Sequence, residues 1–162
     1  MNILAIDPGN KKSAFCVIEA KTRKPLRFDI LPNEQLYEEI RKKKFNETDL
    51  AAIEMLQSYG NLIGKEVLDT VFWIGRYFEA LHRKLYTDPT LIYRMEEKMH
   101  ICHDSKAGDS NIRRALIDRF ATHDFRSGRG TIKSPDWFHG FHNDIWAAYA
   151  IGLTFIETKM EN

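Results

Sequence analysis

Several features that would assign this chain to a class at once are scarce or absent. It has only two cysteines, five prolines and nine glycines among 162 residues, which excludes a disulfide-stapled scaffold and a collagen-like or low-complexity chain. No apolar run approaches the ~18 residues that cross a bilayer, so we expect no membrane partner. The formal net charge is +1, and no overall basic excess indicates nucleic acid. A polyanion-binding surface would therefore have to be local.

The composition that is present predicts one ordered domain. Hydrophobic residues make up 43% of the chain, and charges of both signs are mixed. No repeat or Gly/Ser linker divides the sequence, so we predict a single domain over residues 1–162. Cys16 and Cys102 lie in apolar, strand-like runs without metal-ligand spacing. We expect both to be reduced core thiols in an intracellular, cytoplasmic protein.

The order of the expected elements indicates an α/β fold. Three short apolar runs separated by turn residues predict a meander of antiparallel strands over residues 2–7, 13–19 and 26–31. The later expected elements are a helix capped by Asn33 over 33–45, a strand over 51–54, a helix over 62–85, a strand over 91–95, a helix beginning at Asp109 or Ser110, and a closing helix over 143–157. This order is that of the ribonuclease H-like fold, a five-stranded mixed sheet flanked by helices.

Two of the expected strands end on an acid. Asp7 follows the apolar run 3–6, and Glu54 follows the apolar run 51–53. The sequence at 7–10 also suits an ordinary turn, because Asp, Pro, Gly and Asn are standard turn residues. In the expected fold, however, the first and fourth strands lie side by side, so the two carboxylates would be neighbours.

A third acid would complete a metal site at this edge. Two close carboxylates repel each other, and a divalent cation removes the repulsion. Oxygen ligands select Mg²⁺, with Mn²⁺ as a substitute, and two ions about 3.5–4 Å apart clamp the attacking and leaving oxygens of a phosphoryl displacement. Asp144 begins the closing helix. Taken alone it suits a helix N-terminus, where an acid favours the dipole, but with Asp7 and Glu54 we predict a ligand.

These residues resemble the motifs of the RuvC family of Holliday-junction resolvases, and more closely those of the short RuvC-like resolvases of bacteriophages, over nearly the whole chain. Residues 6–9 resemble the first-strand motif, residues 52–54 the second acidic motif, and residues 144–151 the closing helix. Residues 59–65 lie where the family enters its long central helix, and Lys98 falls on the family's active-site lysine.

The main departure from the family pattern concerns the fourth metal ligand. The family places an acid or a histidine three residues before the last Asp, where this chain has Phe141, and His142 stands one residue off register. A second registration puts Asp144 at that earlier position and leaves Ala147 where the last acid belongs. His142 therefore has two interpretations, a fourth ligand or a solvated loop histidine.

The resemblance implies a Mg²⁺-dependent endodeoxyribonuclease that cleaves Holliday junctions and related branched DNA as a homodimer in a bacterial or phage-infected cell. Asp7 would bridge two ions, with Glu54 on one and Asp144 on the other. Lys98 would offset the charge that develops on the scissile phosphate. The helix expected over 62–85 has an apolar stripe and several aromatic residues, which are either partly a dimer face or entirely core.

Phosphate contacts are expected from basic side chains near the acids. The arginines flanked by glycines at 126–130 are expected on a mobile loop beside Asp144. The predicted DNA-contacting residues are Lys11, Lys12, Lys106, Arg113, Arg114, Arg126 and Arg129.

Two alternative functions remain on the sequence alone. One is a non-catalytic DNA-junction binding protein whose acidic site has decayed, and the other is a ribonuclease H or flap-type nuclease on the same fold. An ATP-binding domain of the actin and sugar-kinase type is disfavoured, because those proteins need two such domains. A zinc enzyme is disfavoured because His100, Cys102 and His103 lack a second ligand pair.

Overall fold

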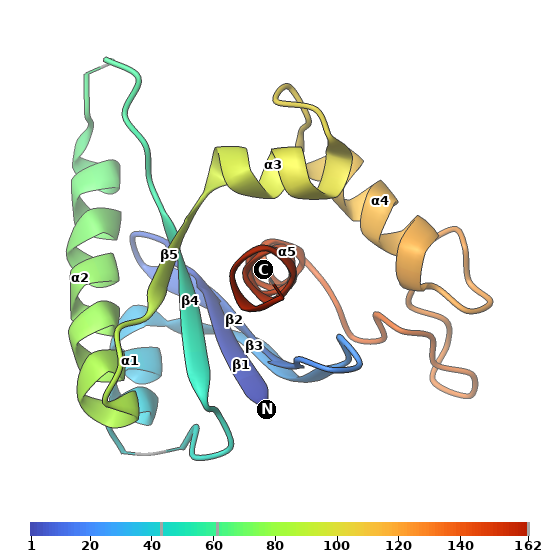
Figure 1. Cartoon of the computed structure of the whole chain (residues 1–162), viewed down its shortest axis with the longest axis horizontal. Helices are drawn as coiled ribbons and strands as arrows, with labels where there is room; N and C mark the ends of the chain where they lie inside the picture. The colour runs from blue at the N-terminus through green and yellow to red at the C-terminus, as the bar shows by residue number, and fades with distance from the viewer. Residues whose placement is uncertain (43, 61, 162) are drawn as a thin grey trace.

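A computed structural model describes residues 1–42, 44–60 and 62–161, so Asn61 of the quoted 59–65 motif lies outside the described residues. Five strands form one sheet in the order β3-β2-β1-β4-β5 (Figure 1). The strands are β1 (Asn2–Asp7), β2 (Lys12–Glu19), β3 (Pro25–Pro32), β4 (Leu50–Met55) and β5 (Thr90–Tyr93). The first three are antiparallel neighbours, whereas β4 and β5 join in parallel. The predicted mixed sheet is confirmed.

Helices cover both faces of the sheet. They are α1 (Asn33–Arg41), α2 (Lys65–Leu85), α3 (Arg94–Cys102), α4 (Asp109–Phe120) and α5 (Ile145–Phe155), which continues into the π-helix η1 (Ile156–Met160). Helices α1 and α2 pack on one face and α5 on the other, with α3 and α4 outside α5 (Figure 1). None of the helices in the described part of the chain has the length and apolar content to span a bilayer.

Strand β1 shows how the sequence divides the core into two layers. Its apolar residues are fully buried, and successive side chains point to opposite faces of the sheet. Leu4 and Ile6 pack in the cluster formed with α1 and α2. Ile3 and Ala5 pack in the cluster formed with α5. A strand that is apolar on both faces therefore lies at the centre of the sheet. Its last residue, Asp7, lies where the strand leaves the sheet, and we call this end of β1 and β4 the sheet edge.

The region after β5 differs from the expectation. The strand ends at Tyr93, because the carboxylate of Glu96 accepts a hydrogen bond from the Tyr93 amide at 2.9 Å and the chain turns into α3. Cys102 therefore lies in a helix, and its expected place in a strand-like run is wrong. Cys16 lies in β2 as expected, and both cysteines are free thiols.

Two expected helix caps are also wrong. Asn33 is the first residue of α1 and follows the N-cap Pro32, and its side chain is buried against β2. Helix α1 ends at Arg41, short of the expected boundary at residue 45. Helix α4 has Gly108 at its N-cap, in place of Asp109 or Ser110, and the Gly108 amide donates to the side chain of Asn111.

Candidate functional site

Asp7 and Glu54 lie side by side at one edge of the sheet. Strands β1 and β4 pair in parallel with Ile6 opposite Ile53, so the next residues of the two strands meet. Both carboxyl groups therefore lie at the same end of the sheet. Burial raises the pKa of Asp7 well above its ordinary value, and the charges of Glu54, Asp144 and Glu97 raise it further. The charges of three other acids therefore act on Asp7 at this edge, as expected for repulsion between nearby carboxylates.

A buried polar network fixes the turn that follows Asp7. The Gly9 amide donates to the Ser13 hydroxyl at 3.2 Å, and the Asn33 amide group donates to the Gly9 carbonyl at 2.9 Å. Ser13 donates to the Asn33 side-chain oxygen at 2.7 Å, and the Tyr77 hydroxyl from α2 lies 3.1 Å from that oxygen. Helix α2 thus holds the turn through side-chain hydrogen bonds, which orients the end of β1.

Gly9 is needed in this turn for steric reasons. A Cβ atom built on Gly9 would lie 2.3 Å from the Lys12 carbonyl oxygen, a backbone atom that cannot move without the strand. The glycine allows β1 to reverse tightly into β2.

Glu97 is the acid that the sequence analysis missed. It lies one turn into α3, and its side chain is 0% exposed. Arg94 donates to Glu97 Oε1 at 2.6 Å, whereas Oε2 has no hydrogen-bond partner among the described residues. Burial raises the pKa of Glu97 to about 7, although the charge of Arg94 opposes the shift. The sequence signal that could have identified Glu97 is its position. It is a carboxylate one helical turn beyond the end of β5, the strand next to β4.

Asp144 approaches the carboxylates of the sheet edge from the start of helix α5, which packs on one face of the sheet. It precedes α5, is exposed, and makes no helix-capping hydrogen bond with its side chain within the described chain. It lines a pocket of about 130 Å³ together with Glu97. We call this the acidic pocket, and its polar lining consists of Arg94, Glu97, Asp109, Arg113, Asn143 and Asp144.

Lys98 and His142 lie outside the acidic pocket. Among the described residues that line it, the cations are Arg94 and Arg113, and partly buried Lys98 is not one of them. His142 is exposed, and its Nδ1 lies 3.1 Å from the Gly140 carbonyl oxygen. Their expected roles in rate and metal binding stay predictions.

The predicted DNA-contacting arginines divide into two groups. Three of them line a second pocket, of about 280 Å³, beside the acidic one. We call it the arginine pocket, and its polar lining consists of Arg113, Arg126, Ser127, Arg129, His142 and Asn143. Arg113 and Asn143 line both pockets. The remaining arginine, Arg114, is bound within the protein, because its guanidinium donates to Asp118 and to the Phe125 carbonyl at 2.6 Å. Lys11, Lys12 and Lys106 are exposed.

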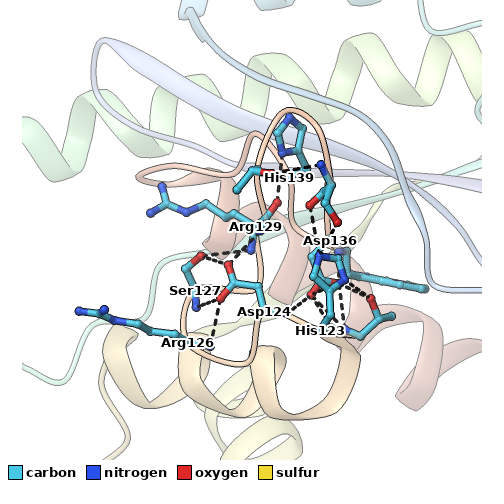
Figure 2. Close-up of polar contacts among 12 residues, drawn as sticks. His123, Asp124, Arg126, Ser127, Arg129, Asp136 and His139 are labelled. Carbon is cyan, nitrogen blue, oxygen red and sulfur yellow. Dashed lines mark hydrogen bonds and ion pairs between the residues drawn. The ribbon is translucent and has the colours of Figure 1, made fainter.

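The segment that carries Arg126 and Arg129 is held by two carboxylates (Figure 2). Asp124 accepts hydrogen bonds from the amides of Ser127 and Gly130, and Asp136 accepts from the amides of residues 122–124. Figure 2 shows the side chains of Arg126 and Arg129 extending to the same side of the loop. The segment is thus fastened at many points, in contrast to the mobile loop that was expected.

The acids at the sheet edge supply the type of donor that a hard divalent cation prefers. Within residues 1–42, 44–60 and 62–161, no three His, Cys, Asp or Glu side chains converge closely enough to hold an ion as they stand. The charges of Glu54, Asp144 and Glu97 nevertheless act on Asp7, and Oε2 of Glu97 is buried without a partner among the described residues. Carboxylate oxygens are the ligands that Mg²⁺ and Mn²⁺ prefer. Ion binding here would require the side chains to draw closer together.

Comparison with protein-family models and with curated proteins finds no match. Among solved structures, T. thermophilus RuvC in complex with a Holliday junction substrate matches with a TM-score of 0.69 at 13% identity, over 99% of this chain and 96% of that one. A second structure of Thermus thermophilus RuvC matches with a TM-score of 0.66 at 14% identity, over the same shares of both chains. The chain has a RuvC-like fold. Its five-stranded mixed sheet flanked by helices is the ribonuclease H-like arrangement predicted from the element order.

Proposed function

We propose that residues 1–162 form a single nuclease domain, a Mg²⁺-dependent endonuclease that cleaves Holliday junctions and related branched DNA by a two-metal mechanism. The observation that carries the proposal is that Asp7 and Glu54 lie side by side near the ends of adjacent strands, with the charge of Asp144 acting on Asp7. The RuvC-like fold supports it, because one matching structure holds a Holliday junction. The resemblance to short phage resolvases supports a cytoplasmic enzyme acting on cellular or phage DNA.

In this mechanism, Asp7, Glu54 and Asp144 would hold the metal ions. The bound ions would supply positive charge to the attacking and leaving oxygens of the phosphodiester. Arg113, which lines both pockets, would guide the DNA backbone from the arginine pocket towards the carboxylates. Lys98 would offset charge on the scissile phosphate, as the family resemblance implies.

Cleavage of an end-labelled four-way junction tests this function. We expect Mg²⁺-dependent nicks near the branch point and no comparable cleavage of a linear duplex with the same sequence. Junction binding without cleavage in Mg²⁺ or Mn²⁺ would favour a non-catalytic junction-binding protein. Faster cleavage of an RNA–DNA hybrid or a flap would favour the other nucleases of this fold.

We also propose a homodimer that uses an apolar patch on α2. The expected stripe on this helix is core only in its C-terminal half, where Ile74 and Leu81 are buried. The N-terminal half and the residues before it expose Leu62, Ile63, Val67, Leu68, Val71 and Phe72. A contiguous apolar patch of this kind is typical of an interface, and a second copy of the chain suits a junction with two arms of opposite polarity.

Leu68→Glu should weaken the dimer at least tenfold. Leu68 is 57% exposed in the patch, and in a two-fold interface each substitution occurs twice, so like charges face one another at a cost of several kcal/mol. Sedimentation velocity over a concentration series measures the change. Leu26→Glu, on β3 and outside the patch, is the matched control and should leave the dimer unchanged. A parent chain that is monomeric at every concentration would contradict the dimer.

Arg126→Ala and Arg129→Ala should each weaken junction binding. Each should also make the negative slope of the log binding constant against log salt shallower by about 1, as expected for the loss of one phosphate contact. Both side chains are exposed in the arginine pocket. Fluorescence anisotropy with a labelled junction at several salt concentrations measures the slope. Arg114→Ala is the contrasting variant. Since Arg114 is bound to Asp118 and the Phe125 carbonyl, we expect a loss of stability with an unchanged salt slope.

A further inference from the structure

One buried carboxylate oxygen has no hydrogen-bond partner among the residues that the structure describes. Glu97 is 0% exposed, and its Oε2 is the one buried side-chain nitrogen or oxygen atom in the described part of the chain without a hydrogen bond. Leaving a buried polar atom unpaired costs about 1–3 kcal/mol, and more for a charged group. Such an atom is therefore expected to have a partner in the working protein.

The position of Glu97 brings it to the sheet edge that carries the other acids. Strand β5 pairs with β4 so that Tyr93 lies opposite Met55, the residue after Glu54. Helix α3 begins immediately after Tyr93, which places Glu97 one turn beyond the edge. The charge of Glu97 acts on Asp7, the charge of Glu54 acts on Glu97, and Glu97 lines the acidic pocket with Asp144.

The described residues supply a partner for only one of the two Glu97 oxygens. Arg94 donates to Oε1 at 2.6 Å and is shared with exposed Asp109. This hydrogen bond fixes the orientation of the carboxylate, in the way that outer partners orient metal-ligating carboxylates. The two guanidinium groups that line the acidic pocket, those of Arg94 and Arg113, leave Oε2 of Glu97 without a hydrogen bond, whereas a divalent cation would both compensate negative charge and coordinate this oxygen.

We propose that Glu97 is a fourth carboxylate ligand of the metal site, with Oε2 bound to the ion and Oε1 held by Arg94. The proposal rests on the proposed metal-dependent function. It assigns the position that the sequence analysis left open, and the assignment goes to a residue of α3 in place of His142. His142 lines the adjoining arginine pocket, and its Nδ1 lies 3.1 Å from the Gly140 carbonyl oxygen.

Calorimetric titration of the full chain with Mn²⁺, in the absence of DNA, tests the assignment. Glu97→Gln keeps the shape of the side chain and an oxygen for Arg94, but it removes the charged ligand. We expect it to lower Mn²⁺ affinity by at least about tenfold, the smaller of the losses seen when even an outer partner of a metal site is removed. Glu79→Gln removes the same charge from an exposed position of α2 and should bind Mn²⁺ like the parent. His142→Ala should also bind like the parent.

Glu97→Asp separates ligation from a simple charge effect. It retains the charge but withdraws the oxygens by one methylene, so we expect Mn²⁺ affinity several-fold below that of the parent. An aspartate variant that binds as tightly as the parent, while the glutamine variant does not, would overturn direct ligation.

Thermal unfolding gives a second readout that needs no activity. Mn²⁺ should raise the Tm of the parent, and the rise should be smaller in Glu97→Gln because the ion stabilises the folded state according to its affinity. If the parent binds Mn²⁺ and the glutamine variant binds it equally, the Glu97 assignment fails while the proposed function stands. If the parent binds no Mn²⁺ at millimolar concentrations, both fail.

Discussion

Asp7→Asn and Glu54→Gln are each expected to reduce Mg²⁺-dependent junction cleavage by at least about 10³-fold, while junction binding in Ca²⁺ or EDTA changes less than about twofold. A loss of 10³ corresponds to ~4 kcal/mol of transition-state stabilisation, which is the scale of charge stabilisation by bound ions. Binding should survive, because the arginine pocket and the exposed lysines contact the DNA backbone in the proposed complex.

The two substitutions should not unfold the protein. The pKa of Asp7 is raised in the folded state, so the folded chain retains a proton that the unfolded chain has released. Stability without metal should therefore fall as the pH rises from about 4 through the raised pKa, and Asp7→Asn should remove this loss. At pH 7 the variant should melt at or above the temperature of the metal-free parent.

Single-turnover cleavage with saturating enzyme and a thermal melt of each variant check the prediction together. Glu79→Gln, on the face of the sheet that carries α2, is a matched loss of one negative charge and should cleave like the parent. Cleavage retained within tenfold in a folded Asp7→Asn protein would remove Asp7 from the mechanism.

The pairing of Asp7 with Glu54 could be predicted because it depends on local pattern and topology. A strand that is apolar on both faces belongs in the middle of a sheet, and the element order places β1 beside β4. Strand β1 ends on Asp7, and β4 ends one residue after Glu54, so the register of Ile6 with Ile53 was sufficient to bring the acids together. Short, continuous apolar runs leave few alternative arrangements.

Glu97 could not be predicted in the same way, because its burial is decided by tertiary contacts. The segment after Tyr93 alternates apolar and charged residues without a clear helical stripe, and a glutamate there is expected to be solvated. Helix α3 packs against both α4 and α5, and Glu97 lines a pocket together with residues of these two helices. Asn33 was misassigned for a related reason. Asparagine favours helix caps, but here its side chain is already hydrogen-bonded to the Ser13 hydroxyl and to the Gly9 carbonyl, so it does not cap the helix.

Asp136→Asn is expected to lower the free energy of unfolding at pH 7 by about 3 kcal/mol, a large loss for an isosteric change. Asp136 is buried and accepts hydrogen bonds from the amides of Thr122, His123 and Asp124 and from the Thr122 hydroxyl. Hydrogen bonds to a charged group contribute about 1.5–3 kcal/mol each, and an asparagine would present a donor group to several of these donors.

The pH dependence of this loss follows from the same contacts. Burial raises the pKa of Asp136, but the amides of His123, Thr122 and Asp124 together outweigh burial and hold the pKa well below its ordinary value. A lowered pKa stabilises the folded state above the unfolded pKa, and the contribution is lost as the pH falls below it. The difference in the free energy of unfolding between the parent and Asp136→Asn should therefore be constant above about pH 5 and decrease below about pH 4.

Denaturant unfolding of both proteins between pH 2.5 and 8 measures the difference. Asp118→Asn removes an exposed carboxylate paired with Arg114 and should change stability by less than about 1 kcal/mol.

The segment held by Asp136 carries Arg126 and Arg129 (Figure 2), so we also expect Asp136→Asn to weaken junction binding. The affinity for Mn²⁺ should stay unchanged, because it depends on the carboxylates of the sheet edge. A variant as stable as the parent at pH 7 would show that the amides of residues 122–124 find other acceptors, and the arginine pocket would then not depend on this carboxylate.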